Sequence, residues 1–335
     1  MISQAINKLS AGNDLSMVET TDSMRQIMNG EATNAQIAAF LTAMHIKGET
    51  IDEITACAMV LREKCTKIVP DKEALDIVGT GGDKSNTFNI STTSSVVIAA
   101  GGVPIAKHGN RSMSSKCGAA DVLEALGVNI SVEPEKSQEV LEKAGICFLF
   151  AQKYHASMRF AGPVRKEIGI PTVFNYIGPL SNPALAKMQL MGVYDAKLVE
   201  PLAKVLVNLG LRRGMVVYGN GIDEATLTGP TMICEFNDGV TKTYTITPEE
   251  VGLKRCELKD LVGGVAEENA EITRNILSGK ERGPKRDAVL LNAGLSLYIG
   301  GKAAAITEGI QMAAQLIDSG KAKAKLDEFV ALTNQ

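Results

Sequence analysis

The sequence predicts a small all-helical N-terminal domain followed by a larger α/β domain with a mainly parallel central sheet. Capping-box patterns recur three times before residue 66. Beyond Pro70, short apolar runs alternate with helical patterns, and a glycine-rich loop follows the first of these runs. A chain of 335 residues is long enough for two domains. We therefore place the helical domain at 1–66 and the α/β domain at 70–335.

Three capping boxes indicate helices in the N-terminal domain: Ser16-x-x-Glu19, Thr33-x-x-Gln36 and Thr50-x-x-Glu53. In each pattern a hydroxyl can accept a hydrogen bond from a free backbone amide, while the side chain three residues later accepts one in return. Gly30 and Gly48 stand where the preceding helices should end. A bundle of this size buries little apolar surface alone, so we expect it to pack on the larger domain or to form a homodimer contact.

The α/β domain is expected to begin with a strand–loop–helix–strand unit. Leu75–Val78 is a short apolar run, Ser91–Ala100 has a helical pattern stopped by glycines, and Val103–Ala106 is the next apolar run. Similar alternation follows at Asp121–Ile130, Cys147–Ala151, Met215–Tyr218 and in a helical tail, Ala288–Leu332. Ligands of parallel sheets bind beyond the carboxyl ends of the strands, which is where the loop Gly79–Asp83 falls.

Composition excludes several classes of function. The net charge of −3, the lack of Trp and an aromatic content of 4% argue against bulk nucleic-acid binding. No segment approaches the ~20 apolar residues of a membrane helix. The six cysteines are widely spaced and form no Cys-x-x-Cys pair, so we expect reduced thiols in a cytoplasmic protein instead of disulfides or a zinc site.

Three glycine- and hydroxyl-rich motifs indicate a phosphate site. The loop Gly79-Thr80-Gly81-Gly82-Asp83 can turn backbone amides toward an anion; alone, its alternative interpretation is a tight strand–helix turn. Asn89-Ile90-Ser91-Thr92 lies at a helix start, where free amides favour phosphate. The segment Lys107–Ser115 leaves the next strand and is dense in cations and hydroxyls; its alternative interpretation is a solvated basic loop.

Taken together, these motifs resemble the anthranilate phosphoribosyltransferase family at matching spacings. The matching segments are GTGGD (79–83), NIST (89–92), KHGNRS-x-SS (107–115), GAADVLEALGV (118–128), LFAQKYHASM (149–158), PVRKEIG (163–169), FNYIGPLSNPA (174–184), GNGIDEATLTG (219–229) and LLNAGLSLY (290–298). The resemblance implies transfer of the 5-phosphoribosyl group of 5-phosphoribosyl-1-diphosphate (PRPP) to the amine of anthranilate, with release of pyrophosphate, in tryptophan biosynthesis.

The same resemblance implies a nucleoside phosphorylase/phosphoribosyltransferase-like fold and a homodimer. The helical domain would mediate dimerisation and supply part of the acceptor site. Helical segments around 155–185 would pack on that domain. The implied partners are the two small-molecule substrates, with no nucleic acid and no membrane.

Site residues follow from the resemblance, position by position. The implied PRPP-binding residues are Gly79, Gly82, Asp83, Thr87, Asn89, Ile90, Ser91, Thr92, Lys107, His108, Gly109, Asn110, Arg111, Ser112, Met113, Ser114, Ser115 and Ala119. The implied anthranilate-binding residues are Gly79, Asn110, His155 and Arg165. The implied magnesium ligands, for two Mg²⁺ ions, are Ser91, Asp223 and Glu224.

The acidic pair Asp223-Glu224 would, in isolation, be interpreted as a solvated surface feature. Adjacent carboxylates point to opposite faces of a strand, but in the loop after a strand they can converge on metal ions. Oxygen ligands are also what a hard cation prefers. The surrounding motif therefore favours a metal site.

Three positions depart from the family pattern. Ala119 and Cys117 stand where serine is common, and Pro171 stands where many members have arginine. Arg165 then becomes the main candidate for the anthranilate carboxylate, against the alternative of an ordinary surface arginine. For His108 and His155 we expect a role in positioning anthranilate more than in proton transfer.

Two other functions compete with this interpretation. A pyrimidine-nucleoside phosphorylase has a related fold and a similar glycine loop, but the KHGNRS motif and the acidic pair argue against it. A nucleic-acid-binding relative without transferase activity should have a basic groove and should have lost its metal ligands. This chain is mildly acidic and has both carboxylates.

Overall fold

A computed structural model describes residues 1–112 and 115–335. Its N-terminal helices are α1 (Ile2–Ser10), α2 (Met17–Met28), α3 (Asn34–Lys47) and α4 (Ile51–Lys64). All three predicted capping boxes are formed, at the starts of α2, α3 and α4. Helix α1 begins without a side-chain cap, which explains why no capping pattern predicted it.

Within the described residues, seven strands form one sheet in the order β3-β2-β1-β4-β5-β6-β7. The strands are β1 (Leu75–Gly79), β2 (Ile105–Gly109), β3 (Ile146–Phe150), β4 (Met188–Gly192), β5 (Arg213–Gly219), β6 (Thr231–Asn237) and β7 (Val240–Ile246). Strands β1 to β5 pair in parallel, whereas β6 and β7 are antiparallel additions at one edge. The predicted fold class, a helical domain with a mainly parallel α/β domain, is confirmed.

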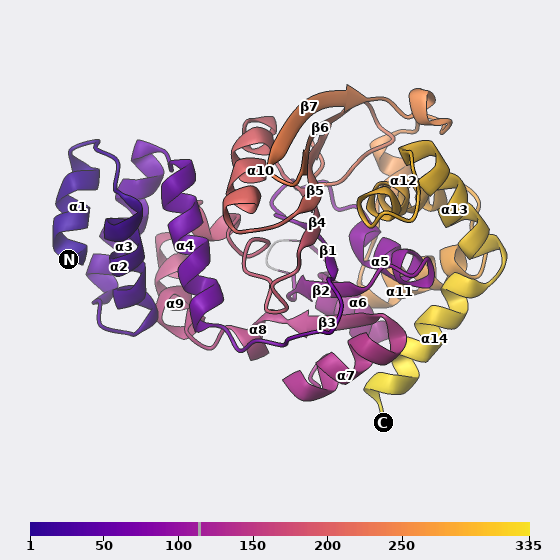
Figure 1. The fold of residues 1–335 in the computed structure, drawn as a ribbon, viewed down its shortest axis with the longest axis horizontal. Coiled ribbons are helices and arrows are strands. Elements are labelled where there is room, and N and C mark those ends of the chain that lie inside the picture. Colours follow the sequence, from indigo (N-terminus) through magenta and orange to yellow (C-terminus); the bar gives the residue numbers. More distant parts are fainter. Residues whose placement is uncertain (113–114) are drawn as a thin grey trace.

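Helices cover both faces of the sheet (Figure 1). They are α5 (Ile90–Ala100), α6 (Ala119–Leu126), α7 (Pro134–Ala144), α8 (Ala151–Tyr154), α9 (Met158–Ile168), α10 (Val199–Asn208), α11 (Ala266–Leu277), α12 (Pro284–Ile299), α13 (Ile306–Asp318) and α14 (Lys321–Thr333). Short 3-10 turns occur at Val173–Asn175, Ala196–Leu198, Glu249–Val251 and Leu258–Leu261. Helices α5 and α11 to α14 lie on one side, and α10 lies between the sheet and α1–α4 on the other. None of the helices in the described residues is long and apolar enough to span a bilayer.

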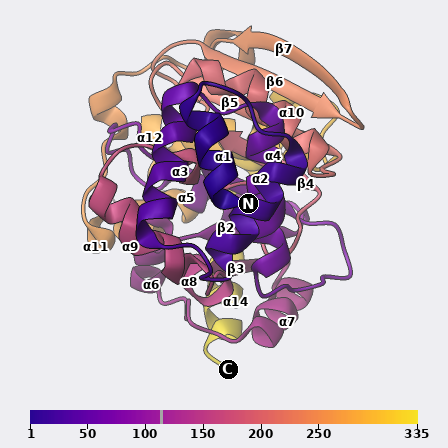
Figure 2. The same ribbon diagram turned by 90° about the vertical axis from the view of Figure 1, so that its left-hand side faces the viewer.

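Neighbouring strand residues enter different cores because successive side chains point to opposite faces. Leu190 and Met215 join the core formed with α5 and α12. Met191 and Val216 join a second core, which also contains α10, α9 and the buried faces of α1–α4. Figure 2 shows the four helices in front of the sheet on this side. The helical bundle therefore shares one continuous core with a face of the sheet.

The order of the strands creates a switch point at β1. From β1 the chain moves through β2 to β3 at one edge, and it then returns to place β4 on the other side of β1. In parallel sheets, ligands bind outside the carboxyl ends of the strands at such a point. The glycine loop follows β1, so it lies where the topology predicts a ligand site.

Candidate active site

Glycines end the three adjacent parallel strands β1, β4 and β5, at Gly79, Gly192 and Gly219. A Cβ atom on Gly79 would meet the carboxylate of Asp223, and one on Gly192 would meet the backbone oxygen of the same aspartate. At Gly219 a Cβ atom would meet the backbone oxygen of Glu224. The loop after β5 thus folds back across the ends of all three strands, which is possible because these strands end without side chains.

The two acidic side chains of this loop turn to different partners. Asp223 Oδ2 accepts a hydrogen bond of 2.7 Å from the backbone N–H of Gly81 in the glycine loop. Glu224 Oε1 accepts hydrogen bonds from Ser91 at the start of α5, from its backbone N–H at 3.1 Å and from its hydroxyl at 2.6 Å. The acidic pair therefore connects two of the motifs that the sequence assigned to phosphate.

Burial makes this carboxylate group costly to ionise. It raises the pKa of Asp223 well above its usual value, and the negative charges of Asp83 and Glu224 raise it further. Burial also raises the pKa of Glu224 to about 7, against the opposing effects of the Ser91 hydrogen bonds and the charge of Lys107. Ionising Asp223 and Glu224 together is therefore unfavourable unless a further positive charge is present.

Chemically, this donor set suits Mg²⁺. Asp83, Asp223 and Glu224 offer carboxylate oxygens, Ser91 offers a hydroxyl, and a divalent cation would compensate the buried charge. In the described part of the chain, no three acidic, His or Cys side chains already converge as a metal cluster. The residues fit the ion by ligand chemistry and by charge.

The glycine loop has an unusual backbone. Gly81 and Gly82 have φ values of +70° and +86°, and the non-glycine residues Lys84 and Asn86 are also left-handed, at 58° and 53°. Asp83 Oδ1 stabilises the turn by accepting a hydrogen bond from the Ser85 N–H at 3.1 Å. The backbone at Gly81 and Gly82 is exposed and so can approach an anion closely.

The start of α5 is held by polar contacts that leave its amide end near Glu224. Asn89 Nδ2 donates to the backbone oxygen of Cys117 at 3.2 Å, and its Oδ1 accepts from Asn269 at 2.9 Å. Ile90 and Thr92 are buried in the first turn. Thr87, just before the helix, forms an isolated bridge with Val262.

Strand β2 delivers Lys107 and His108 to the same edge, and both side chains are buried. Lys107 Nζ donates a 2.6 Å hydrogen bond to the backbone oxygen of Ile77, and burial lowers its pKa. The rings of His108 and His155 lie 5.0 Å apart. Burial lowers the pKa of His155 to about 4 and that of His108 well below its usual value, so both rings are neutral at pH 7.

Farther along the basic motif, the side chain of Arg111 lies against α6. Its guanidinium pairs with Asp121 at 2.8 Å and with Glu124 at 2.9 Å, and it lies over the ring of Phe150. The Ser112 N–H also donates to Asp121, at 3.1 Å.

Gly109 and Ser115, also in the predicted PRPP set, contact residues at or just before the start of α6. A Cβ atom added to Gly109 would lie 3.2 Å from the Cβ atom of Ala119, which is the first residue of α6. The Ser115 hydroxyl donates to the backbone oxygen of Cys117. Met113 and Ser114, which the sequence assigned to PRPP, lie outside the described residues.

Two residues assigned to anthranilate lie on α9 and directly after β2. Arg165, on α9, lies with its guanidinium 4.9 Å from the centre of the Phe174 ring and donates to the Phe174 backbone oxygen at 3.3 Å. Burial lowers its pKa, and among the described residues it forms no ion pair with a carboxylate. Asn110 is exposed, and its Oδ1 accepts from the Arg111 N–H at 2.8 Å.

Sequence reasoning missed several residues beneath and beside this site. Asp76 and Asn182 are fully buried polar side chains bonded to each other, and an aspartate inside the apolar run of β1 was a visible signal for them. Tyr194, just after β4, was also missed. Its ring comes within 3.9 Å of the position that a Cβ on Gly82 would take.

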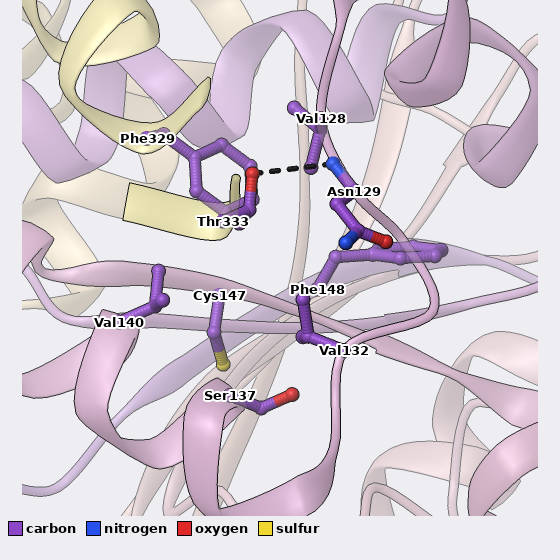
Figure 3. Close-up of a pocket in the computed structure, with 9 residues that line it drawn as sticks. All are labelled: Val128, Asn129, Val132, Ser137, Val140, Cys147, Phe148, Phe329 and Thr333. Atoms are coloured by element: carbon purple, nitrogen blue, oxygen red, sulfur yellow. Dashed lines mark hydrogen bonds between the residues drawn. The ribbon is translucent and has the colours of Figure 1, made fainter. Parts of the chain in front are cut away.

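A separate pocket lies away from these loops (Figure 3). It is lined by Val128, Asn129, Val132, Ser137, Val140, Cys147, Phe148, Phe329 and Thr333. The Asn129 N–H donates to the Thr333 hydroxyl across it, at 3.2 Å. The pocket has no room for a water molecule, so it is a packing defect between α7, β3 and α14 and not a ligand site.

Comparisons with known proteins agree with this geometry. The model of the α/β domain of a glycosyl transferase family matches residues 71–323, and the model of the helical bundle domain of a glycosyl transferase family matches residues 3–65. The anthranilate phosphoribosyltransferase of Ruminiclostridium cellulolyticum is 57% identical over all of this chain and 98% of its own length.

Solved structures give the same result. The anthranilate phosphoribosyltransferase of Thermus thermophilus superposes with a TM-score of 0.95 at 43% identity, covering 99% of both chains. The Saccharomyces cerevisiae enzyme in complex with PRPP and Mg superposes with a TM-score of 0.90 at 29% identity, covering 99% of this chain and 98% of its own. The complex of the same yeast enzyme with 4-fluoroanthranilate superposes with a TM-score of 0.89 at 28% identity, covering 99% of this chain and 98% of its own. The chain belongs to the anthranilate phosphoribosyltransferase family.

Proposed function

We propose that the loops at the carboxyl ends of β1, β2 and β5 transfer the 5-phosphoribosyl group of PRPP to the amine of anthranilate. The products are N-(5-phosphoribosyl)anthranilate and pyrophosphate. The observation that carries this proposal is the acidic pair after β5, which bonds to both the glycine loop and the start of α5. The yeast relative with PRPP and Mg supports it, because that protein has the same fold.

The PRPP half of the site is proposed to combine backbone amides with a metal. The left-handed glycine loop and the first turn of α5 offer N–H groups to phosphate oxygens, and Lys107 adds a buried positive charge. Ser91, Asp223 and Glu224 would hold Mg²⁺, and we propose two ions. When bound, Mg²⁺ neutralises the charge that builds on the departing diphosphate.

The acceptor half is proposed to orient anthranilate. Arg165 has a half-buried guanidinium whose described contacts are the ring and the carbonyl of Phe174, so it retains donors for a carboxylate. Asn110 offers an exposed amide, and His155 has two buried ring nitrogens without hydrogen-bond partners. An aromatic amine is already neutral at pH 7, so orientation matters more than activation by a base.

The transfer itself is mainly an electrostatic task. Loss of diphosphate develops positive charge on the ribose ring and negative charge on the leaving group. Amides fixed by the glycine loop stabilise the leaving group without moving during the reaction. Attack from the opposite face would invert the anomeric carbon.

Assembly and location belong to the same proposal. We propose that residues 1–66 form the helical domain and mediate a homodimer, and that 70–335 form the catalytic domain. Large apolar side chains on the helical part, including Val18 and Ile46, are well exposed, which supports a contact there. All six cysteines are free thiols in the described structure, which suits a reducing cytoplasm.

The decisive experiment follows the fluorescence of anthranilate with PRPP and Mg²⁺. Loss of anthranilate fluorescence that requires both PRPP and Mg²⁺ is the expected result. Phosphorolysis of thymidine or uridine without PRPP would instead identify a pyrimidine-nucleoside phosphorylase.

A further inference from the structure

One segment, 174–184, is held by buried polar side chains from the strands beneath it. Gln189 on β4 donates a 2.8 Å hydrogen bond from Nε2 to the backbone oxygen of Pro179. Asp76 on β1 accepts a 2.8 Å hydrogen bond at Oδ2 from Nδ2 of Asn182. Asp76, Asn182 and Gln189 are each at most 1% exposed. The segment is therefore fixed from below by polar bonds and not by apolar packing alone.

The helical domain also holds this segment. Arg62 on α4 donates from Nε to the backbone oxygen of Leu180 at 2.6 Å and from Nη1 to that of Leu209 at 3.1 Å. Both acceptors are carbonyls, and no carboxylate pairs with this arginine among the described residues. Both domains thus contribute donors that fix the position of 174–184.

Segment 174–184 borders the residues proposed for anthranilate. Its Phe174 carbonyl accepts from Arg165, and its Gly178 and Ser181 carbonyls lie beside His108 and His155, where they oppose the lowering of the two histidine pKa values. No comparable contact joins the segment to the glycine loop in the described structure. A displacement of 174–184 should therefore disturb the residues proposed for anthranilate more than the glycine loop.

Asp76 and Asn182 connect this segment to the strand that carries His108. Asp76 Oδ1 accepts from the His108 N–H at 3.2 Å, while Asn182 Nδ2 also donates to the Ala106 oxygen at 2.8 Å. Burial raises the pKa of Asp76 to about 6, while the charge of Lys107 and the hydrogen bonds from Asn182 and His108 oppose this rise. An apolar pair of similar volume would leave the buried His108 N–H and Ala106 oxygen without these hydrogen bonds, which is costly. These hydrogen bonds fix β2 and segment 174–184 relative to each other.

We propose that Asp76 and Asn182 are positioning residues for the acceptor half of the site. They set the relative placement of β2 and segment 174–184, and through these the placement of His108, His155 and Arg165. This inference rests on the proposed function, because it needs an acceptor to be positioned. Neither residue touches the substrate.

Asn292 on α12 provides a matched comparison. It is fully buried, and it bonds to the residue after Glu224: Oδ1 accepts from the Ala225 N–H at 3.1 Å and Nδ2 donates to the Ala225 oxygen at 2.8 Å. It holds the acidic loop as Asn182 holds 174–184. Its loss should affect PRPP and Mg²⁺ and spare anthranilate.

The test is steady-state kinetics of the full-length enzyme with anthranilate and PRPP varied in turn. Asn182→Ala and Asp76→Asn are expected to raise the KM for anthranilate about tenfold, the equivalent of one hydrogen bond. The KM for PRPP should change less than about threefold. Asn292→Ala is expected to show the reverse pattern.

Any other outcome contradicts the proposed positioning role of Asp76 and Asn182. Equal changes in both KM values for Asp76→Asn and Asn182→Ala, with the wild type active, would make the pair merely structural and overturn the proposal alone. A wild type without turnover would overturn the proposed function as well. If Asn182→Ala does not fold, Asp76→Asn, which preserves size and one acceptor oxygen, decides the result. If neither variant folds, the pair is a folding requirement and the proposal fails.

Discussion

Glu224 and Ser91, 133 positions apart in the chain, are joined by two hydrogen bonds to a single carboxylate oxygen. The contact places a carboxylate at the amide end of α5, where the helix dipole favours negative charge. The same helix end is proposed to bind phosphate. Two anions can share it when a cation lies between them, so this contact is a physical reason to expect Mg²⁺ here.

The first prediction concerns this acidic pair. The double variant Asp223→Asn/Glu224→Gln preserves shape but removes the charge that attracts the metal. Turnover at limiting Mg²⁺ should fall by about a hundredfold or more. Folding should survive, since burial raises the pKa of both carboxyls and neutral amides relieve that cost. Glu257→Gln, at an exposed carboxylate, is the control. Near-normal turnover of the double variant would remove the metal assignment.

The close approach of Gly79 and Asp223 gives a second prediction. A methyl group at position 79 would collide with the Asp223 carboxylate, so Gly79→Ala should destabilise the enzyme by about 1–3 kcal/mol. In an Asp223→Ala background most of that loss should disappear, because the nearest atoms are then gone. Urea unfolding of the four proteins in this cycle measures the coupling. Additive losses would show that the two residues are not in contact.

Elements with a local sequence signal were predicted well, whereas pairings between distant segments were predicted less well. The capping boxes of α2, α3 and α4 were predicted because each pattern lies within four residues. Strands β6 and β7 were not expected, although Asp238-Gly239 is a hairpin signal and both residues adopt positive φ in the turn. Strand β4 is a short apolar run that periodicity cannot distinguish from a helix segment.

Site geometry was less accessible to sequence reasoning, for a different physical reason. A motif gives the residue types but not the contacts that each side chain chooses. Arg111 belongs to the basic motif, yet Asp121 and Glu124, neighbours on one face of α6, bind its guanidinium. Asp76 and Asn182 meet across 106 positions of chain, which no local pattern encodes.

Arg165 is predicted to bind the carboxylate of anthranilate and to contribute little to PRPP binding. A charge-assisted hydrogen bond is worth about 1.5–3 kcal/mol, so Arg165→Ala should weaken anthranilate binding by about ten- to hundredfold. The KM for PRPP should move by no more than about threefold. Lys166→Ala removes an equal charge from an exposed position on the same helix and is the control. Equal losses for both substrates would refute the assignment.

The proposed homodimer leads to a prediction about mass. Light scattering at micromolar concentration should give about twice 35.5 kDa. Val18 on α2 and Ile46 on α3 are 69% and 78% exposed in the single chain, so Val18→Lys/Ile46→Lys should yield monomers. Val240→Lys alters an equally exposed valine on β7 and should leave the dimer intact. A wild type that is monomeric and fully active would contradict this assignment.

The last prediction is that the buried His155 makes the fold less stable in acid. Its side chain is 6% exposed, and burial lowers its pKa to about 4, whereas an unfolded histidine titrates near 6.5. Between these values the unfolded chain binds a proton that the folded chain does not. The free energy of unfolding should therefore fall as pH drops from about 6.5 toward 4. His155 alone should lower it by about 2 kcal/mol between pH 7 and pH 5.

Carboxyls whose pKa burial raises, such as Asp76 at about 6, act in the opposite direction in this window, because there the folded chain holds the extra proton. The comparison must therefore be made between variants. From pH 7 to pH 5, His155→Asn should lose about 2 kcal/mol less stability than the wild type by urea unfolding. Between pH 8 and 9 the stability difference between the two proteins should stay constant, since His155 is neutral there in both the folded and the unfolded state. Equal pH slopes for the two proteins from pH 7 to 5 would mean that His155 is protonated in the folded enzyme, and its ring would then carry charge beside the acceptor.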